Sequence, residues 1–277
     1  MDINRYAKKM SQSIRHAAVA GMFYPSEPSE LNAIVHALFQ SAETESSIDT
    51  SRCPKAIIAP HAGYIYSGPT AAMAYQCLQN CRDQYHRVVL LGPSHRVAFN
   101  GMALSSADQY ETPLGTIPLD TETIRALEDV DFVAINNQAH QDEHSLEVHL
   151  PFLQSTLNEF SLVPIVVGDI DPAKVAKILE RFENDPHTLI VISTDLSHFR
   201  EYNIAKQRDQ DTSNAILNYD YNAIGYHDAC GRNPVNGALY WAQQHHHPIK
   251  LIDLRNSGDT AGDKDRVVGY AAYHIYK

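Results

Sequence analysis

The sequence has no long apolar run and no excess of basic residues. No stretch approaches the roughly 20 apolar residues of a membrane-spanning helix. The first ten residues have no apolar core after their basic residues, so we expect no secretory signal. Lys and Arg number 22 against 33 Asp and Glu, which gives a formal net charge of -11. Because nucleic acids and anionic membranes bind basic surfaces, we expect neither as a partner.

Cysteine is also scarce. The 277 residues include four cysteines, at positions 53, 77, 81 and 230. Four is too few for a disulfide scaffold at this length, so we expect a reduced, cytoplasmic protein. Cys77 and Cys81 stand four residues apart with no second cysteine pair, which gives a zinc ribbon little support. We expect both to be buried packing residues.

Short apolar runs that end near Gly or Pro predict buried strands. They cover residues 56–59, 87–92, 162–168, 188–193, 250–254 and 267–276. Helical spacing predicts helices over residues 31–39, 70–80, 121–127, 146–157, 172–182, 203–218 and 234–244, and the turn-rich segment 110–120 indicates a hairpin. The helix at 172–182 joins two strands in a βαβ unit, which favours parallel pairing.

The chain shows no repeat, low-complexity tract or clear linker. We therefore predict an α/β protein in which residues 15–277 form a single domain and residues 1–14 are a flexible segment. The central β-sheet is expected to be mostly parallel or mixed, with helices on both faces.

Two histidines follow predicted strands. His61 stands in Ala59-Pro60-His61-Ala62-Gly63, and His95 in Gly92-Pro93-Ser94-His95. Open α/β sheets place their ligand sites at the strand ends, and neutral imidazole is the commonest protein metal ligand. Each histidine alone could be a loop or capping residue, but the repeated design favours a shared site.

A third strand, at 188–193, leads into Thr194-Asp195-Leu196-Ser197-His198. A carboxylate three residues before an imidazole could orient that ring. This arrangement suits a general acid or base, or a metal ligand with its supporting partner.

The segment Asp142-Glu143-His144-Ser145-Leu146-Glu147-Val148-His149 is rich in ligand types but less specific. Its spacing is not that of the zinc-protease helix, and an acidic first helical turn explains it equally well. We expect His144 to contact substrate or to support the metal ligands.

Cys230 precedes Gly231 and the helix predicted at 234–244. A helix N-terminus lowers a thiol pKa and favours thiolate, although a packing cysteine is equally consistent with the sequence. With two imidazoles, the thiolate would form a His/His/Cys site suited to iron, copper or zinc. The triplet His245-His246-His247 is expected to be a solvated turn, because adjacent residues do not readily converge on one metal.

Five ordered motifs make the chain resemble the Memo family. They are Ile58-Ala59-Pro60-His61-Ala62-Gly63-Tyr64, Leu91-Gly92-Pro93-Ser94-His95, Asp142 to Phe152, Ser193-Thr194-Asp195-Leu196-Ser197-His198 and Cys230-Gly231-Arg232. The resemblance runs from about Arg15 to Tyr276. It implies a fold similar to that of the class III, LigB-like extradiol dioxygenases, with a pocket at one edge of the sheet.

The resemblance also implies roles for single residues. His61, His95 and Cys230 match the metal-ligand positions, while Asp195 and His198 match residues that line the same pocket. We expect Glu143, His144 and Tyr64 to contact substrate or to support the ligands. The dioxygenases use two histidines and a carboxylate, so Cys230 in place of the carboxylate weighs against ring cleavage.

Three functions fit these residues. The first is a redox metalloenzyme that binds iron or copper, with zinc as another option, and uses His198 and Asp195 on a small-molecule substrate. The second is a metal-binding or peptide-binding scaffold that kept the fold and lost the chemistry. The third is a hydrolase with Cys230 as nucleophile and His198 as base. The resemblance further implies a radical-SAM protein as a pathway partner.

Overall fold

The central sheet has nine strands within the part of the chain that the structure describes, residues 13–45 and 52–277 of a computed structural model. The strands are β2 (Ala56–Ala59), β3 (Arg87–Pro93), β4 (Met102–Leu104), β7 (Val133–Ile135), β8 (Ser161–Val167), β9 (Thr188–Ser193), β10 (His198–Arg200), β11 (Ile249–Asn256) and β12 (Val267–Ile275). Their order is β10-β12-β2-β9-β3-β8-β4-β7, and β11 pairs with most of the length of β12.

The middle of this sheet is parallel. β2 pairs with β9, β9 with β3 and β3 with β8, all in the same direction, whereas β12 runs antiparallel to β2 and β4 runs antiparallel to β8. Because both faces of the parallel part are covered, its strands are apolar almost throughout. The predicted βαβ unit is parallel as expected, but β3 lies between its two strands, so β8 and β9 do not pair directly.

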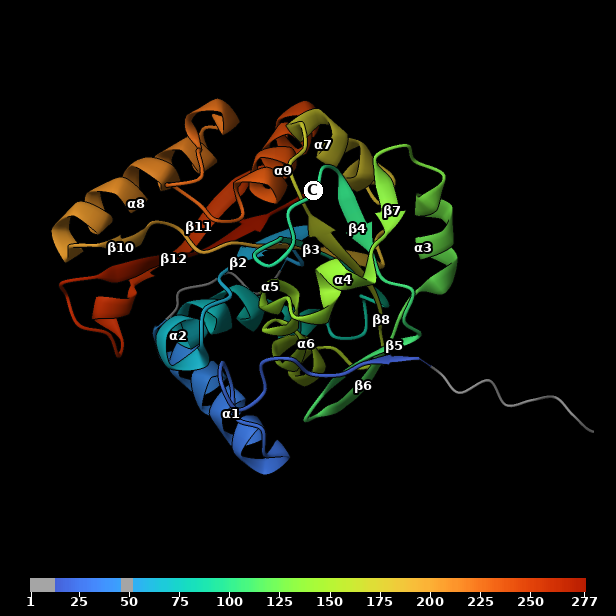
Figure 1. Ribbon diagram of the computed structural model, residues 1–277. Coiled ribbons are helices and arrows are strands. Elements are labelled where there is room, and N and C mark those ends of the chain that lie inside the picture. The colour runs from blue at the N-terminus through green and yellow to red at the C-terminus, as the bar shows by residue number, and fades with distance from the viewer. Residues whose placement is uncertain (1–12, 46–51) are drawn as a thin grey trace, which may run out of the picture.

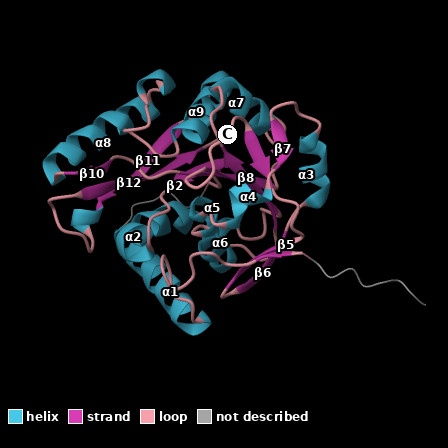
Figure 2. Ribbon diagram, viewed as in Figure 1, coloured by secondary structure: helices cyan, strands magenta, loops and turns pink. Residues whose placement is uncertain are grey.

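Helices cover both faces of the sheet, as predicted (Figures 1 and 2). One face carries α1 (Pro28–Glu45), α2 (Tyr64–Tyr75), α5 (His144–Glu147) and α6 (Leu150–Thr156), and the other α7 (Pro172–Glu180), α8 (Tyr202–Leu217) and α9 (Arg232–His245). At the β7 edge lie α3 (Thr121–Glu128) and α4 (Asn137–Gln141). Short 3-10 helices follow at η1 (Gln76–Cys81), η2 (Tyr221–Ala223) and η3 (Ser257–Asp259).

A second, three-stranded sheet joins the N-terminal segment to the predicted hairpin. β5 (Gln109–Thr112) and β6 (Gly115–Pro118) are antiparallel, and β1 (Ile14–Arg15) pairs with β5. The expected flexible segment falls mostly on residues 1–12, which lie outside the described residues. Ser13 already donates its backbone N–H to the Asp108 carboxylate at 2.7 Å, and Ile14 begins β1.

Buried Glu147 anchors the segment that follows β1. Its carboxylate forms an ion pair with Arg15 and accepts hydrogen bonds from the backbone N–H groups of Ala18 and Val19 and from the Tyr24 hydroxyl. A buried carboxylate is stable only when its oxygens are paired in this way. Glu147 therefore holds the N-terminal segment against α5.

Two helix predictions differ from the structure at their ends. α1 continues to Glu45, into the loop expected at residues 41–52, of which 46–51 lie outside the described residues. α2 begins at Tyr64 rather than near residue 70, with Pro69 inside it. The helix expected over 146–157 is split into α5 and α6, and Pro151 stands in the first turn of α6.

The expectations of a reduced protein and of a Cys81 that only packs are both wrong, because Cys53 and Cys81 form a disulfide across a sequence separation of 28. The loop before β2 runs beside η1, and spacing along the chain could not reveal that proximity. Cys77 is free and buried, with its sulfur 3.4 Å from Nε2 of His274.

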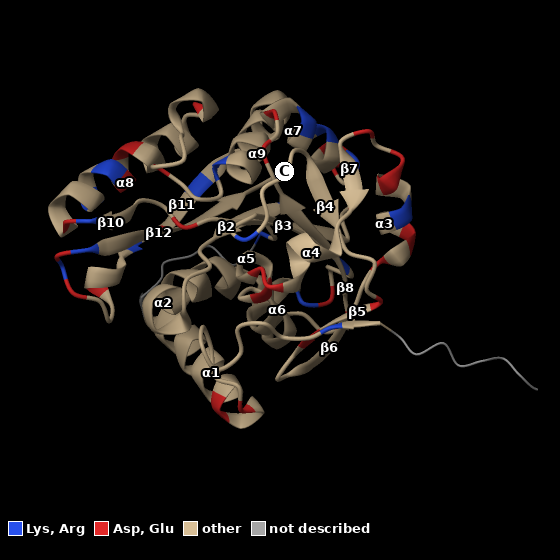
Figure 3. Cartoon of the chain, viewed as in Figure 1, with Lys and Arg blue, Asp and Glu red and all other residues tan. Residues whose placement is uncertain are grey.

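None of the helices in the described residues combines the length and the apolar character needed to cross a bilayer. Both α3 and α8 carry charged residues of both signs (Figure 3).

Two buried histidines predict a loss of stability in acid. His140 and His274 each contact a backbone carbonyl through Nε2, and burial lowers the pKa of each from 6.5 to about 4. Between these values the unfolded chain binds protons that the folded chain does not. The free energy of unfolding should therefore fall as pH drops from about 6.5 to about 4, by up to about 3 kcal/mol per histidine.

Urea denaturation between pH 7.5 and 4.5 measures this loss. In His274→Gln, which cannot titrate at this position, the dependence on pH should be shallower than in the wild type. Equal pH dependence in the two proteins would rule out His274 as a source of the acid sensitivity.

Candidate metal centre

Three strand ends meet at one edge of the sheet. Ala59 of β2 lies opposite Ser193 of β9, and Leu91 of β3 lies opposite Ile192. Because these strands are parallel, the segments that leave their carboxyl ends start side by side. The register thereby brings together the loops that carry His61, Asp195 and His95.

His61 is held rigidly just beyond β2. Its backbone N–H donates to Oδ1 of Asp195 at 2.8 Å, and its ring Nδ1 lies 2.5 Å from the Ser193 hydroxyl. The side chain is buried. Chiefly burial, and then the neighbouring histidines, lower the pKa of His61 far below its usual value, so the ring is neutral. A neutral ring is the form that binds a metal.

His95 is held by Glu143, a buried residue that caps α5. One carboxylate oxygen accepts from the His95 backbone N–H at 2.6 Å, and the other contacts ring Nδ1 at 2.8 Å. Burial alone would raise the pKa of Glu143, but hydrogen bonds from His95 and from the Ser145 backbone N–H outweigh it and lower that pKa to about 2. Glu143 is therefore ionised and can only accept from His95.

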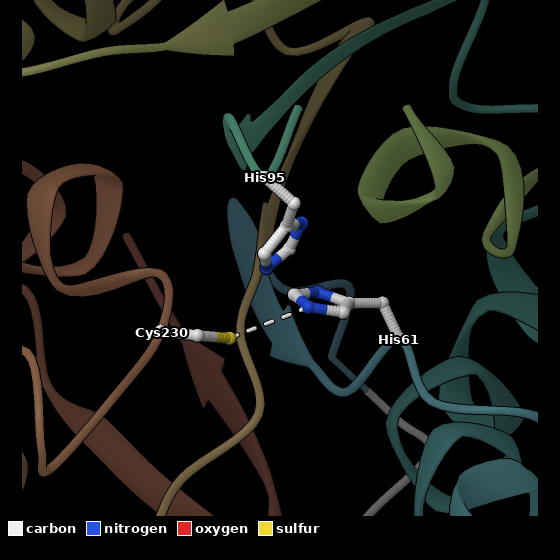
Figure 4. Close-up of side chains that lie close together, drawn as sticks. All are labelled: His61, His95 and Cys230. Carbon is white, nitrogen blue, oxygen red and sulfur yellow. Dashed lines mark hydrogen bonds between the residues drawn. The ribbon is translucent and has the colours of Figure 1, made fainter. Parts of the chain in front are cut away.

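Cys230 reaches the two histidines from the loop before α9. Its sulfur lies 3.3 Å from Nε2 of His61 and accepts from the Asp195 backbone N–H at 3.3 Å (Figure 4). Gly231 permits this approach, because a Cβ there would lie 2.3 Å from the carbonyl oxygen of Ser193. The loop can pass so close to β9 only because residue 231 has no side chain.

The expected lowering of the Cys230 pKa is wrong for the protein without metal. Burial, and then the charge of Asp195, raise the pKa of the thiol well above its usual value. Cys230 lies two residues before the first residue of α9, where these two effects exceed any helix-terminus effect. The thiol is protonated, and a bound metal would displace its proton.

Hydrogen bonding fixes which ring nitrogen of each histidine is free. The Ser193 hydroxyl donates to the carbonyl of Ser145 at 2.7 Å, so it can only accept from Nδ1 of His61. The Glu143 carboxylate likewise accepts a hydrogen bond from the protonated Nδ1 of His95. Both rings therefore present an unprotonated Nε2, the atom that a metal requires.

The donor set fits a transition-metal ion. One ligand atom from each of His61, His95 and Cys230 lies within 4.8 Å of the other two, and Figure 4 shows the three side chains converging. Two imidazoles and a thiol suit iron, copper or zinc. Glu143 and His144 form a second such group with His95, so a carboxylate and a third imidazole lie directly beside the centre.

Asp195 and His198 both lie near this centre, but the expected contact between them is not what holds His198. Asp195 is buried and bonds the His61 backbone, because the parallel pairing of β2 and β9 places that N–H next to it. The His198 ring instead contacts the carbonyl of Leu196 through Nδ1 at 2.8 Å. Among the described contacts, the imidazole nearest the Cys230 sulfur is that of His61, not the base expected for a hydrolase.

His144 and Tyr64 occupy different surroundings. The ring of His144 stacks on His95 with 4.6 Å between centroids and lies 4.7 Å from the ring of Phe23. The Tyr64 hydroxyl donates to the carbonyl of Val148 at 2.8 Å, and its ring packs on Phe152. His144 thus lies among the candidate ligands, and Tyr64 is buried in the core behind them.

Sequence reasoning missed the role of Ser193 and of His149. The Ser193 hydroxyl contacts both His61 and Nε2 of His149, and the other nitrogen of His149 contacts the hydroxyl of Tyr75 at 2.9 Å. The one available signal was a polar residue at the end of the most apolar strand. No pattern in the sequence pointed to Tyr75.

This chain matches the model of the Memo-like protein family over residues 15–274. The chain belongs to the Memo-like protein family. It is 37% identical over 269 residues to a MEMO1 family protein of Aquifex aeolicus, covering 93% of this chain and 97% of that protein. It is 36% identical over 279 residues to one of Ignicoccus hospitalis, covering 94% and 97%. The identity with one of Thermoplasma volcanium is 32% over 272 residues, with the same coverage.

A solved structure shows a related fold. An uncharacterized protein of Escherichia coli superimposes on this Memo-like chain with a TM-score of 0.51 at 14% sequence identity, covering 80% of this chain and 99% of that chain. At this identity the likeness concerns the fold alone.

A cavity of about 440 Å³ reaches the candidate centre. Its lining includes Cys230, Ser94 beside His95, and the side chains of Phe99, Tyr226 and Asn233. Cavities of this size are typical of small-molecule sites. Three other cavities are larger, at about 490, 640 and 520 Å³, but His61, His95 and Cys230 line none of them.

Replacing Gly231 tests whether the close approach positions Cys230. Gly231→Ala should push the loop from β9 and weaken metal binding by at least about tenfold. Titration with Co²⁺ measures this directly, because thiolate coordination gives a charge-transfer absorption band. Gly63→Ala is the matched control, since a Cβ at Gly63 meets only ordinary contacts at 3.5 Å or more. Equal Co²⁺ affinities in Gly231→Ala and Gly63→Ala would show that the close approach of the Gly231 loop to β9 does not position Cys230 for metal binding.

Proposed function

We propose that this Memo-like protein is a redox metalloenzyme in which His61, His95 and Cys230 bind iron or copper and His198 transfers protons to or from a small-molecule substrate. The observation that carries the proposal is the paired arrangement of Ser193 and Glu143. Each accepts a hydrogen bond from Nδ1 of one histidine. Nε2 of both rings is thereby left unprotonated, and the two rings face the same candidate metal position.

His198 suits the role of a proton carrier. Its ring is half-buried, and Nδ1 contacts the carbonyl of Leu196, which leaves Nε2 as the basic nitrogen. His198 is also close enough to His61 for its charge to contribute to the lowered pKa of that ring, after burial and the nearer histidines. Asp195 fixes the His61 backbone, so it positions a ligand rather than the base.

The cavity beside Cys230 supports a small molecule as substrate. Its volume admits a compact organic molecule, and it runs from Cys230 along the loop after β3 to Phe99 and Tyr226. The aromatic rings would pack on apolar parts of that molecule, and Asn233 supplies a polar contact at the wall. A substrate held there lies against the Cys230 side of the centre.

Bound iron or copper would supply one-electron redox chemistry at this site. We relate the fold to the LigB-like extradiol dioxygenases, whose metal is held by two histidines and a carboxylate. In this chain Cys230 replaces the carboxylate, and the neighbouring Glu143 is engaged by His95. We therefore expect oxidation without ring cleavage.

Metal analysis tests the ligand set. Protein purified without oxygen and supplied with Fe²⁺ or Cu⁺ should retain about one metal ion per chain, and His61→Ala and Cys230→Ser should each lose it. A Tyr226→Phe control keeps the three ligands and should retain the metal. Elemental analysis measures the content, and unchanged content in His61→Ala would contradict the proposal.

Oxygen uptake tests the role of His198. The metal-loaded protein should consume oxygen saturably with a member of a panel of catechols and other small reductants. His198→Ala should keep its metal and lose at least about a hundredfold in rate, the usual contribution of a positioned acid or base. If the loaded wild type shows no saturable uptake, the centre serves binding alone, as in a metal-binding or peptide-binding scaffold.

A further inference from the structure

A second group of ligand-type side chains lies at the other end of α9. One atom from each of Glu183, His245 and His247 lies within 4.8 Å of the other two. Cys230 precedes α9 and His245 ends it, so the 14 residues of the helix separate the two groups by about 20 Å. The second group shares no residue with the candidate centre described above.

A single backbone feature brings the two histidines together. His246 adopts left-handed φ and ψ of 55° and 33° and ends α9. This turn stacks the rings of His245 and His247, with 5.3 Å between their centroids and 18° between their planes. The expectation of a solvated turn is therefore wrong for His247, which is buried and packs against Trp241 at 4.8 Å.

Carboxylates complete the group from α7 and the turn after it. Oε2 of Glu183 lies 3.0 Å from Nε2 of His247, and both side chains are about 5% exposed. Oε2 of Glu180 lies 2.6 Å from Nε2 of His245. The carboxylate of Glu180 thus holds the ring of His245, as carboxylates commonly hold metal-binding histidines.

Lys277 orients the Glu183 carboxylate from the opposite side. Its Nζ lies 3.2 Å from Oε1 of Glu183 and also donates to Oδ1 of Asn184 at 3.0 Å. Oε1 is therefore occupied by the lysine, and Oε2 faces the histidines. The group offers one carboxylate oxygen and two imidazoles at a single place, already ordered.

We propose that Glu183, His245 and His247 form a second metal site that binds Zn²⁺ and ties the end of α9 to the turn after α7. Two imidazoles and one carboxylate are a typical zinc ligand set, with water in the fourth position. The set lacks a thiolate, which separates it chemically from the site of Cys230. Its role is to stabilise the fold.

Zinc binding to the full-length, tag-free chain tests this site. In Cys230→Ser, where the first centre is disabled, equilibrium dialysis should find about one Zn²⁺ per chain. Adding His245→Asn should weaken that binding at least about tenfold. His245 is only partly buried, so this change should leave the fold intact, which circular dichroism checks.

The neighbouring His246 provides the matched control. It is exposed, and Asn tolerates its left-handed conformation, so His246→Asn in the Cys230→Ser background should keep the zinc affinity. Zn²⁺ should raise the melting temperature of Cys230→Ser and of the His246→Asn variant, but not of the His245→Asn or Glu183→Gln variants. Equal zinc affinity and equal stabilisation in all four proteins, or no zinc binding in Cys230→Ser, would overturn the proposal.

Discussion

The parallel register of β2, β9 and β3 is the constraint on which the rest of the candidate centre depends. It sets Ala59 beside Ser193, so the next turns of chain present His61 and Asp195 to each other. A shift by one residue would turn every side chain of these buried strands to the opposite face of the sheet and disrupt the packing on both faces, which fixes the register firmly. The same pairing holds the loop of Cys230, whose backbone and sulfur both bond to the backbone of Asp195. Packing of the apolar core thus determines positions of polar atoms that have no packing role themselves.

The two histidine ligands already have the tautomer and orientation that metal binding requires before a metal is bound. Ser193 and Glu143 settle the tautomers of His61 and His95 through contacts that the folded chain already makes. Little of the binding energy is then needed to order the rings, because burial and hydrogen bonding have already restricted them. The thiol of Cys230 is different, since burial keeps it protonated and a metal must displace that proton.

How far the sequence predicts this protein depends on the range of each interaction. Apolar runs marked six of the nine described strands of the central sheet, and strand-end motifs marked His61 and His95, because these signals are local. The position of β3 between β8 and β9 depends on pairing between strands that are distant in the sequence, and no local pattern predicts it. The partners of Asp195 and Ser193 lie in the loop after β2, in α5 and just before α6, far away along the chain, and were missed for the same reason. Chain spacing also suggested that Cys81 only packs, although Cys53 lies beside it in space.

That disulfide encloses a defined piece of the molecule. The segment between Cys53 and Cys81 contains β2, His61 and α2, so even the unfolded polypeptide carries this segment as a covalent macrocycle. Closing a ring of this length removes conformational freedom worth about 3.5 kcal/mol from the unfolded ensemble in the chain-entropy model. Thiol–disulfide exchange thereby acts on the same folding equilibrium that positions His61, without contacting any metal ligand. The redox potential of the surroundings therefore influences the stability of the fold that holds the candidate centre, although the disulfide lies outside that centre.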